Sequence, residues 1–187
     1  MLYSFCPLGT LKNRLNSIAI KAPYLILIGE ESSYAYAKTG LGIVQWAPEC
    51  VAGQLRFTNR ACDLGVPDLS IEEAKAAGVR SLLFGVAPIG GVVPDSWWEA
   101  AREAARSGLD VVCGLHVRLA EQVELVAAAK QSGSRLIDVR EPTVDIPIGS
   151  GLTRRGKRVL TVGPDCAIGK KYTALALDRS MRERGLN

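Results

Sequence analysis

A glycine-rich segment near the carboxyl terminus carries the strongest chemical signal in this sequence. Gly163 and Gly169 enclose five residues, Pro-Asp-Cys-Ala-Ile, and Lys170 follows the second glycine directly. Glycines let the backbone curl so that its N–H groups face phosphate oxygens, the start of a helix adds positive potential, and a lysine adds a point charge. The pattern therefore predicts a phosphate-binding loop (P-loop) over residues 163–173.

The loop departs from the usual P-loop spacing, which has four residues between the glycines and a Ser or Thr directly after the lysine. Here Lys171 stands at the hydroxyl position and Thr173 is the nearest hydroxyl, so magnesium coordination is less favoured and no metal site is predicted. The alternative is a glycine turn with a solvated Lys170. We favour phosphate binding because a strand-like run precedes the loop and a helical pattern follows it. The predicted contact residues are Gly163, Pro164, Asp165, Cys166, Ala167, Ile168, Gly169, Lys170, Lys171, Tyr172 and Thr173.

Two side chains inside the loop have chemistry of their own. Asp165 places a carboxylate beside the predicted phosphate, which is repulsive unless a metal ion or a hydrogen-bond donor compensates. We therefore include Asp165 among the candidate catalytic residues. Cys166 carries a nucleophilic thiol, but a contribution of its backbone alone is the favoured interpretation.

Other candidates follow strand-like runs. His116, the single histidine, is a candidate catalytic acid or base, and a structural role at a strand end is an equal alternative. Arg140 is a candidate for holding a substrate carboxylate in a bidentate pair. A plain ion pair between Arg140 and Asp138 is slightly favoured over that role.

Two adjacent pairs of residues complete the set of candidates. Gly90 and Gly91 are predicted to bind substrate through close backbone approach, although a simple turn also explains them. Trp97 and Trp98 lie in the first turn of a predicted helix. Packing is favoured for this tryptophan pair over a binding platform.

Alternation of short apolar runs with amphipathic segments predicts the elements that position these residues. The predicted strands are 24–28, 42–46, 81–86, 110–114 and 135–139. The predicted helices are 32–38, a helix from a capping box at Ser70 and Glu73 to Gly78, another from a box at Ser96 and Glu99 to Gly108, and 119–131. Repeated strand–helix–strand units imply a Rossmann-like α/β fold, a parallel sheet with helices on both faces and ligands at the carboxyl ends of the strands.

The pattern also predicts how the chain is divided. Residues 1–21 form an N-terminal leader and residues 22–140 the Rossmann-like domain. Residues 141–157 contain several prolines and glycines without a period and are the predicted linker. Residues 158–187 start a P-loop domain with a strand at 158–162 and a helix at 170–184. Because the chain stops after that helix, we expect the P-loop domain to be truncated.

Composition narrows the classes of function. The 187 residues are 48% hydrophobic and 22% charged with a net charge of +4, an ordinary composition for a soluble protein. Basic residues gather only beside the glycine loop, so nucleic-acid binding is not expected. Five cysteines without a C-x-x-C pair predict reduced thiols in a cytoplasmic protein. The longest apolar run is too short to cross a membrane.

Residues 163–177 resemble the phosphate loop of a bacterial and archaeal two-domain family long catalogued as of unknown function. That family pairs a Rossmann-like N-terminal domain with a P-loop C-terminal domain, and its characterised members are D-glutamate N-acetyltransferases that use acetyl-CoA. The resemblance continues upstream at Trp46-Ala-Pro-Glu49, Gly53-Gln-Leu55, Asp63-Leu-Gly-Val-Pro-Asp68, Gly90-Gly91, Ser107-Gly-Leu-Asp110, Gly114-Leu-His116 and Asp138-Val-Arg140. It implies acetyl transfer to a small amino acid such as D-glutamate, with acetyl-CoA held by the loop. A homo-oligomer is also expected.

Two further functions are open at this point. The five-residue loop is also similar to that of dethiobiotin synthetase, which would place Lys170 and a magnesium ion on the γ-phosphate of ATP. A non-catalytic nucleotide-binding fragment is the third interpretation.

Overall fold

The computed structural model describes residues 19–141, 149, 151–152, 155–164 and 169–186. The chain divides into two compact units, Met1–Asp145 and Ile146–Asn187. The division falls inside the predicted linker. Each unit is described by itself.

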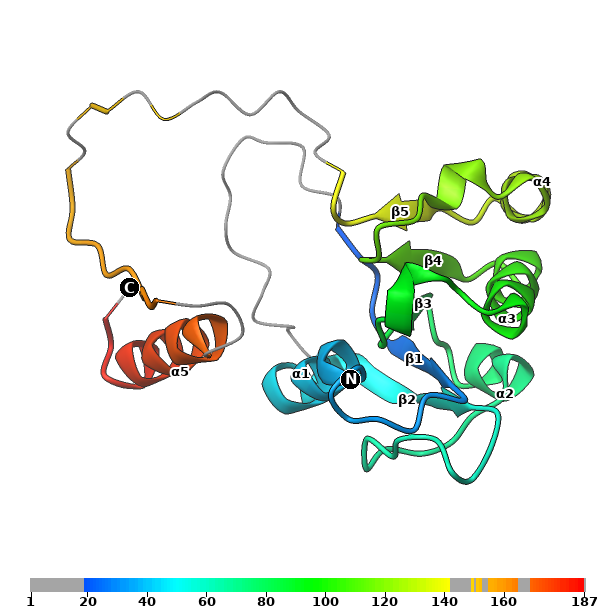
Figure 1. The fold of residues 1–187 in the computed structure, drawn as a ribbon, viewed down its shortest axis with the longest axis horizontal. Coiled ribbons are helices and arrows are strands. Elements are labelled where there is room, and N and C mark those ends of the chain that lie inside the picture. The colour runs from blue at the N-terminus through cyan, green and yellow to red at the C-terminus, as the bar shows by residue number, and fades with distance from the viewer. Residues whose placement is uncertain (1–18, 142–148, 150, 153–154, 165–168, 187) are drawn as a thin grey trace, which may run out of the picture. The chain divides into compact units, whose positions relative to one another are not determined.

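A five-stranded parallel sheet forms the centre of the first unit (Figure 1). Its strands are β1 (Tyr24–Gly29), β2 (Val51–Arg56), β3 (Ser81–Phe84), β4 (Asp110–Cys113) and β5 (Leu136–Asp138). Their order across the sheet is β2-β1-β3-β4-β5. The chain first steps from β1 to β2 and then returns across β1 to β3, so the direction of winding reverses between β1 and β3. We call this place the switch point, and it is where doubly wound sheets bind ligands.

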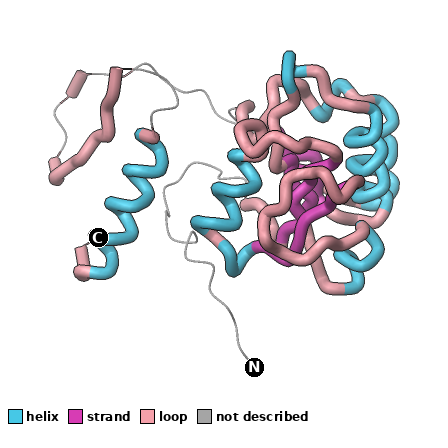
Figure 2. The backbone as a smooth tube through the Cα atoms, turned by 60° about the horizontal axis from the view of Figure 1, so that its bottom comes forward, coloured by secondary structure: helices cyan, strands magenta, loops and turns pink. Residues whose placement is uncertain are grey.

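Helices cover both faces of this sheet, as the sequence predicts. Helix α1 (Lys38–Trp46) lies on one face, and α2 (Ile71–Ala76), α3 (Asp95–Arg106) and α4 (Val123–Ser132) lie on the other (Figures 1 and 2). Residues 25–28 of β1 are completely buried, as expected of a strand covered on both sides. None of the described helices has the length and apolar character needed to span a membrane.

The second strand differs from the prediction. Residues 42–46, predicted as a strand, form the end of α1, and the second strand is instead β2. Gly40 allows α1 to lie close to the sheet, because a Cβ atom there would stand 3.2 Å from Ile26 Cγ2. Its N–H also donates to the carbonyl of Gly85 at 2.7 Å. These tertiary contacts outweigh the local strand preference of Ile43 and Val44.

One of the two predicted capping boxes is present. Ser70 Oγ accepts from the Glu73 N–H at 3.1 Å, and Glu73 Oε2 accepts from the Ser70 N–H at 2.7 Å, so the box at the start of α2 is confirmed. The box predicted at Ser96 is wrong. Helix α3 begins at Asp95, and the Ser96 hydroxyl donates to the Glu30 carboxylate at 3.0 Å.

The tryptophan pair of α3 belongs to the core. Trp97 and Trp98 are 2% and 8% exposed, and both rings pack against Phe84 at centroid distances of 6.5 and 5.9 Å. The predicted packing role is therefore confirmed.

A buried carboxylate paired with partly exposed cations anchors the amino edge of the sheet. The Asp110 carboxylate accepts from Arg135 Nε at 2.9 Å and Nη2 at 2.6 Å, and Lys21 Nζ lies 3.4 Å away. Burial alone would raise the pKa of Asp110, but the hydrogen bonds and charge of Arg135, helped by Lys21, hold the pKa below its usual value. The carboxylate is thus ionised and paired inside the fold.

The second unit holds one described helix, α5 (Lys170–Glu183), which starts where the sequence predicts. None of its residues is buried. The strand predicted at 158–162 is not formed, since residues 157–163 carry no strand structure. A strand needs a neighbour to complete its hydrogen bonds, and the described residues of this unit supply none.

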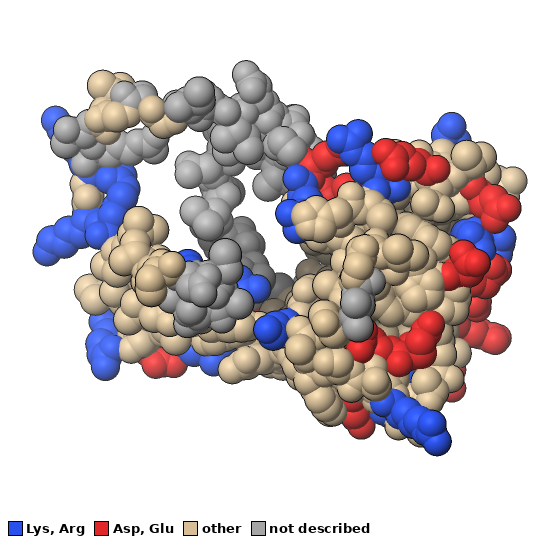
Figure 3. Space-filling model, viewed as in Figure 1, with Lys and Arg blue, Asp and Glu red and all other residues tan. Residues whose placement is uncertain are grey.

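The two units also differ in charge. Residues 1–145 contain 14 Lys and Arg against 16 Asp and Glu, whereas residues 146–187 contain nine against three. On the side in view, acidic and basic side chains are mixed over the first unit, and basic ones predominate over the second (Figure 3).

Candidate functional site

Three loops come together at the switch point. They are residues 30–37 after β1, 57–70 after β2 and 85–94 after β3. The Phe57 N–H donates to the Gly29 carbonyl at 2.9 Å, and the Cys62 N–H donates to the Glu31 carbonyl at 2.7 Å. The loops after β1 and β2 therefore lie against each other.

The loop after β3 contains the two glycines predicted to bind substrate. The Ala87 N–H donates to the Tyr36 carbonyl at 2.9 Å, which joins this loop to the one after β1. Gly90 and Gly91 have φ angles of +70° and +76°, in the region that glycine adopts without strain. A Cβ atom on either would meet nothing within 4 Å. Turn geometry therefore accounts for both glycines within the first unit, and their contact with substrate stays a prediction.

A cavity of about 250 Å³ opens between the loops after β1 and β3 and the start of α3. We call it the switch-point cavity; its wall includes Glu30, Glu31, Ser32, Val92, Pro94 and Trp97. Glu30 Oε2 accepts from the indole Nε1–H of Trp97 at 2.9 Å, which fixes the direction of the carboxylate. Glu31 Oε1 accepts from the Ser33 N–H at 2.7 Å. Within the described part of the chain neither glutamate has an ion-pair partner.

The thiol of Cys62 is influenced by the charge of Glu31 at the wall of this cavity. Burial raises the pKa of Cys62, and the negative charge of Glu31 raises it further. Glu31 therefore lies close enough for its charge to act on the Cys62 thiol.

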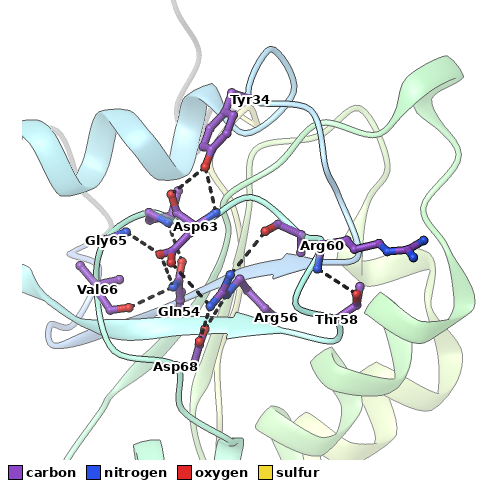
Figure 4. Close-up of polar contacts among 11 residues, drawn as sticks. Tyr34, Gln54, Arg56, Thr58, Arg60, Asp63, Gly65, Val66 and Asp68 are labelled. Carbon is purple, nitrogen blue, oxygen red and sulfur yellow. Dashed lines mark hydrogen bonds and ion pairs between the residues drawn. The ribbon is translucent and has the colours of Figure 1, made fainter.

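The loop after β2 is held rigidly by a buried amide (Figure 4). Gln54, which is fully buried, donates from Nε2 to Asp63 Oδ1 at 2.8 Å and to the Val66 carbonyl at 3.0 Å. Its Oε1 accepts from the Leu64 N–H at 2.8 Å. A buried polar group that is satisfied in this way orders the backbone around it. Gln54 therefore sets the path of residues 63–66.

Arg56 and Asp68 close the same network. The Arg56 guanidinium makes a two-pronged contact with the Asp68 carboxylate and lies 3.7 Å from an oxygen of Asp63. The hydrogen bond with Asp68 raises the pKa of Arg56 and lowers that of Asp68. The hydrogen bond from Gln54 lowers the pKa of Asp63. Each charged group of the network has a partner inside it, so a structural role accounts for these residues.

Arg60 is different from Arg56, although both follow β2. Its N–H donates to Thr58 Oγ1 at 3.0 Å, which stabilises the turn. Its side chain is exposed and points away from the Gln54 network (Figure 4). Within the described ranges, no carboxylate pairs with the Arg60 guanidinium.

A second group of candidates lies at the ends of β4 and β5. The Asp138 carboxylate accepts from the Leu119 N–H at 3.1 and 3.3 Å, and burial is the main cause that raises the pKa of Asp138. The predicted ion pair between Asp138 and Arg140 is wrong, because the backbone of Leu119 reaches that carboxylate instead. The nearby arginine that is paired is Arg118, whose Nη2 lies 2.8 Å from an oxygen of Glu141.

His116 and Arg140 are both exposed at this end of the sheet. Neither lines the switch-point cavity. Among the described residues, neither the His116 nor the Arg140 side chain takes part in a hydrogen bond or an ion pair. Their predicted roles, in acid–base catalysis and in carboxylate binding, stay predictions.

The described cysteines offer no reactive thiol. Burial raises the pKa of Cys113 to about 11, so its thiolate is scarce at neutral pH. Cys62 and Cys113 are free, as predicted, but Cys50 forms a disulfide bond, which corrects the prediction of reduced thiols for that residue.

The glycine loop is described only at its two ends. Asp165, Cys166, Ala167 and Ile168 lie outside the described residues, so their predicted roles stay predictions. Gly169 has a φ of +98° and directly precedes α5. Thr161 Oγ1 donates to the carbonyl of Lys170 at 2.9 Å, and Lys171 Nζ lies 5.1 Å from the centre of the Tyr172 ring.

The described end of the loop suits an anion. Gly163 and Pro164 precede the gap and are exposed, and so is Thr173, whose N–H donates to the Gly169 carbonyl at 2.9 Å. The start of a long helix carries partial positive charge, and Lys170 adds a full charge there. Phosphate binding by residues 163–173 stays a prediction, because residues 165–168 lie outside the described part of the chain.

A larger cavity, of about 430 Å³, lies between β2, α2 and α3. Its wall is mainly apolar, with Leu55, Phe57, Ile71 and Ala100, and Glu99 and Glu103 also line it. No residue selected from the sequence for its chemistry lines this cavity.

Local sequence patterns did not single out Glu30 and Glu31, which line the switch-point cavity. Both glutamates follow the predicted strand 24–28 after Gly29 alone, and this position at the carboxyl end of a buried strand was a usable signal.

Comparison with known proteins supports the two-part organisation. Residues 53–142 match the Rossmann-like domain of unknown function DUF1611_N, and residues 147–187 match the P-loop domain DUF1611_C. A crystal structure of a DUF1611 family protein from Anabaena variabilis is 31% identical with a TM-score of 0.72, over 88% of this chain and 51% of that one.

Two curated relatives carry a functional name, D-glutamate N-acetyltransferase. The protein from Tritonibacter scottomollicae is 42% identical over 167 residues, which are 89% of this chain and 50% of the relative. The protein from a Pseudoalteromonas species is 35% identical over 168 residues, which are 90% of this chain and 51% of the relative. The chain thus spans about half the length of the curated relatives it matches.

Proposed function

Because the chain belongs to the DUF1611 family, with its Rossmann-like domain and part of its P-loop domain, we propose that it contributes to N-acetyl transfer. The acceptor is the amine of D-glutamate or a similar amino acid, and acetyl-CoA is the donor. The observation that carries this proposal is 42% and 35% identity, over about nine tenths of the chain, to two proteins named D-glutamate N-acetyltransferase.

The reaction sets requirements that can be compared with the chain's residues. The acceptor nitrogen loses a proton and attacks the thioester carbonyl, so that a C–N bond forms, the C–S bond breaks and the thiol leaves. Such a reaction needs a site for the amine, a proton acceptor and a site for an anionic donor. Acetyl-CoA supplies the activated acetyl group and several phosphates.

The second unit fits the anionic donor. Lys170 and Lys171 stand at the start of α5, where the helix dipole favours negative charge. The excess of basic residues over residues 146–187 acts in the same direction. Lys170 is the residue that we assign to the phosphates.

A chimera gives a direct test. This chain replaces the matching region of the Tritonibacter relative, and formation of N-acetyl-D-glutamate from acetyl-CoA is followed by mass spectrometry. We expect activity, and we expect Lys170→Ala to weaken acetyl-CoA binding by about 10- to 100-fold, as for loss of a charge-assisted contact. Lys130→Ala on α4 is the matched control, with no change expected.

Calorimetric titration separates the transferase from the ATP-dependent alternative. We expect acetyl-CoA binding that does not require magnesium. Magnesium-dependent ATP binding without acetyl-CoA binding, together with an inactive chimera, would contradict the proposal.

A further inference from the structure

We propose that Asp138 is a positioning residue for the acetyl transfer, and that it acts through the loop that carries His116. This loop, residues 114–118, joins β4 to the short 3₁₀ helix Leu119–Glu121, and we call it the histidine loop. His116 accepts the proton of the attacking amine, and Asp138 holds the loop that presents the imidazole. The inference rests on the proposed function, because it assigns the proton transfer of that reaction.

The histidine loop is anchored through every second residue. Leu115 and Val117 are partly buried and pack against the main core, and Leu119, which follows the loop, is completely buried. His116 and Arg118, which stand between these anchors, are exposed. The loop thus turns its apolar side chains inward and its imidazole outward. Moving the imidazole would require apolar side chains to leave the core, which is unfavourable.

The carboxylate of Asp138 fixes the end of the histidine loop. Both of its oxygens accept from the Leu119 N–H, at 3.1 and 3.3 Å, and Asp138 is itself the last residue of β5, which pairs with β4. At the start of the loop, the Leu115 N–H donates to Cys113 Sγ at 3.4 Å. The loop is therefore tied to neighbouring strands at both of its ends.

The imidazole of His116 has no structural task that would explain this arrangement. It is exposed, and among the described residues it takes part in no hydrogen bond or ion pair. The alternative of a histidine hydrogen-bonded at the strand end therefore finds no partner there. His116 is also the single histidine of the chain, and histidine is the residue type most often used to accept and return a proton near neutral pH.

The histidine loop lies on the edge of the sheet where ligands are expected. β4 pairs in parallel with β3, so the loops that follow these two strands leave the sheet at the same edge. The loop after β3 contains the predicted substrate residues Gly90 and Gly91, and part of it lines the switch-point cavity. Doubly wound sheets bind their ligands outside the carboxyl ends of the strands. His116 therefore follows a strand next to the predicted acceptor residues.

The proton that we assign to His116 is taken up and returned within one turnover. The acceptor's ammonium first loses one proton to solvent, and its neutral nitrogen attacks the thioester carbonyl. As the C–N bond forms, a second proton passes from nitrogen to the imidazole, and the C–S bond breaks with its electron pair on sulfur. The imidazolium then returns that proton to the thiolate. Such transfers need heavy atoms about 3 Å apart, which is why the position of the loop matters.

Two variants of Asp138 test its hold on the loop. Asp138→Ala removes the acceptor of the Leu119 N–H, whereas Asp138→Asn keeps an acceptor oxygen. We expect hydrogen exchange at Leu119 to accelerate in Asp138→Ala and to stay near that of the original chain in Asp138→Asn. In the active chimera, Asp138→Ala is expected to lower kcat about 10- to 100-fold, the cost of a misplaced catalytic group, with KM for acetyl-CoA unchanged. Asp138→Asn is expected to restore most of kcat.

A neighbouring carboxylate provides the matched control. Glu141→Gln removes only the exposed ion pair with Arg118, and exposed pairs contribute little to stability. We expect this variant to leave both kcat and hydrogen exchange at Leu119 unchanged. A loss of kcat as large as that of Asp138→Ala would contradict the special role of Asp138.

A double variant tells a positioning role from a purely structural one. His116→Ala alone is expected to lower kcat about 100- to 10,000-fold. If Asp138 acts through His116, Asp138→Ala causes no further loss in the His116→Ala background. Equal losses from Asp138→Ala with and without the imidazole overturn the inference, because a structural defect acts in both backgrounds.

Failure of this inference and failure of the proposed function give different results. A chimera that is active but insensitive to His116→Ala or to Asp138→Ala overturns the inference alone. An inactive chimera overturns the proposed function and the proton transfer with it. Unchanged hydrogen exchange at Leu119 in Asp138→Ala overturns the hold on the loop, whether or not the chimera is active.

Discussion

The two units of this chain obtain their structure from different sources. The first unit buries an apolar core around β1, and its elements include a helix that local preference disfavours. In the second unit, α5 has no buried residue and depends on local signals. Within the described residues, only the first unit therefore carries its own tertiary stabilisation.

Local sequence explains why α5 forms and the strand before it does not. Residues 174–177 are Ala-Leu-Ala-Leu, all good helix formers, and Asp178 pairs with Arg182 at 2.8 Å one turn later. A helix closes its hydrogen bonds within one segment. Residues 158–162 cannot form a sheet without a neighbour, so the same chain shows a helix and no strand there.

Replacing Asp110 is expected to lower the stability of the first unit more than any other change, and to leave the second unit unchanged. Asp110→Ala removes the buried carboxylate that accepts from the backbone N–H and the guanidinium of the partly exposed Arg135, and the loss of these charge-assisted hydrogen bonds costs about 3 kcal/mol. Urea unfolding followed by near-ultraviolet circular dichroism measures it, because all three tryptophans lie in the first unit. A loss below 1 kcal/mol would contradict the assignment of this pair as the anchor of the amino edge.

Removing the buried amide has the next largest effect. Gln54→Leu leaves the Leu64 N–H and the Val66 carbonyl without their partner, at a cost of about 2–3 kcal/mol. Hydrogen exchange of residues 63–66 is expected to accelerate more than exchange of β3 or β4. Uniform acceleration across the sheet would instead mean that Gln54 has no special hold on the loop.

Acid is expected to lower the stability of the first unit through protonation of Asp110. Because the folded pKa of Asp110 is below its unfolded value, its stabilisation is present above the ordinary pKa of about 3.9 and is lost as pH falls through the folded pKa. The loss is about 1.4 kcal/mol for each pKa unit of the shift. Urea midpoints of the first unit at pH 7, 5, 4 and 3 should show this fall.

Two observations check the assignment of the acid sensitivity to Asp110. Asp138 has a raised folded pKa, so its contribution has the opposite sign and favours the fold as pH falls through that pKa. Asp110→Asn is expected to flatten the acid slope. An unchanged slope in this variant would assign the acid sensitivity to other carboxylates.

The smallest effect belongs to the second unit. Asp178→Ala removes an exposed pair with Arg182, and exposed pairs between residues four apart contribute little to the stability of a helix. A slight loss of far-ultraviolet helical signal is expected, with the unfolding of the first unit unchanged. A large effect on the first unit would contradict the separate sources of structure described above.

Much of the first unit follows from local patterns. In the first unit, four strands and one helix cap lie close to their predicted places: β1, β3, β4, β5 and the cap at Ser70. In the second unit, the same holds for the start of α5. Short apolar runs and glycine stops identify them because each element's own residues suffice. The glycine loop is also a local signal, since curled backbone, lysine and helix start are consecutive in the chain.

The misassignments share one cause, which is contact between distant residues. Gly40 packs against Ile26, and Asp138 turns to Leu119 instead of to Arg140. β2 was overlooked because its centre contains Gly53 and the polar Gln54, whose burial depends on residues 63–66. No local pattern encodes these contacts.

The sequence by itself determined the class of fold, the family resemblance and the place of the glycine loop, because each depends on residues that are neighbours in the chain. The tertiary structure alone decided that Glu30, Glu31 and Trp97 line one cavity, and that Asp110 is ionised inside the protein. The physical reason is that charge and cavity geometry arise where separate strands end side by side. Their energies depend on burial and on partners far away in the chain.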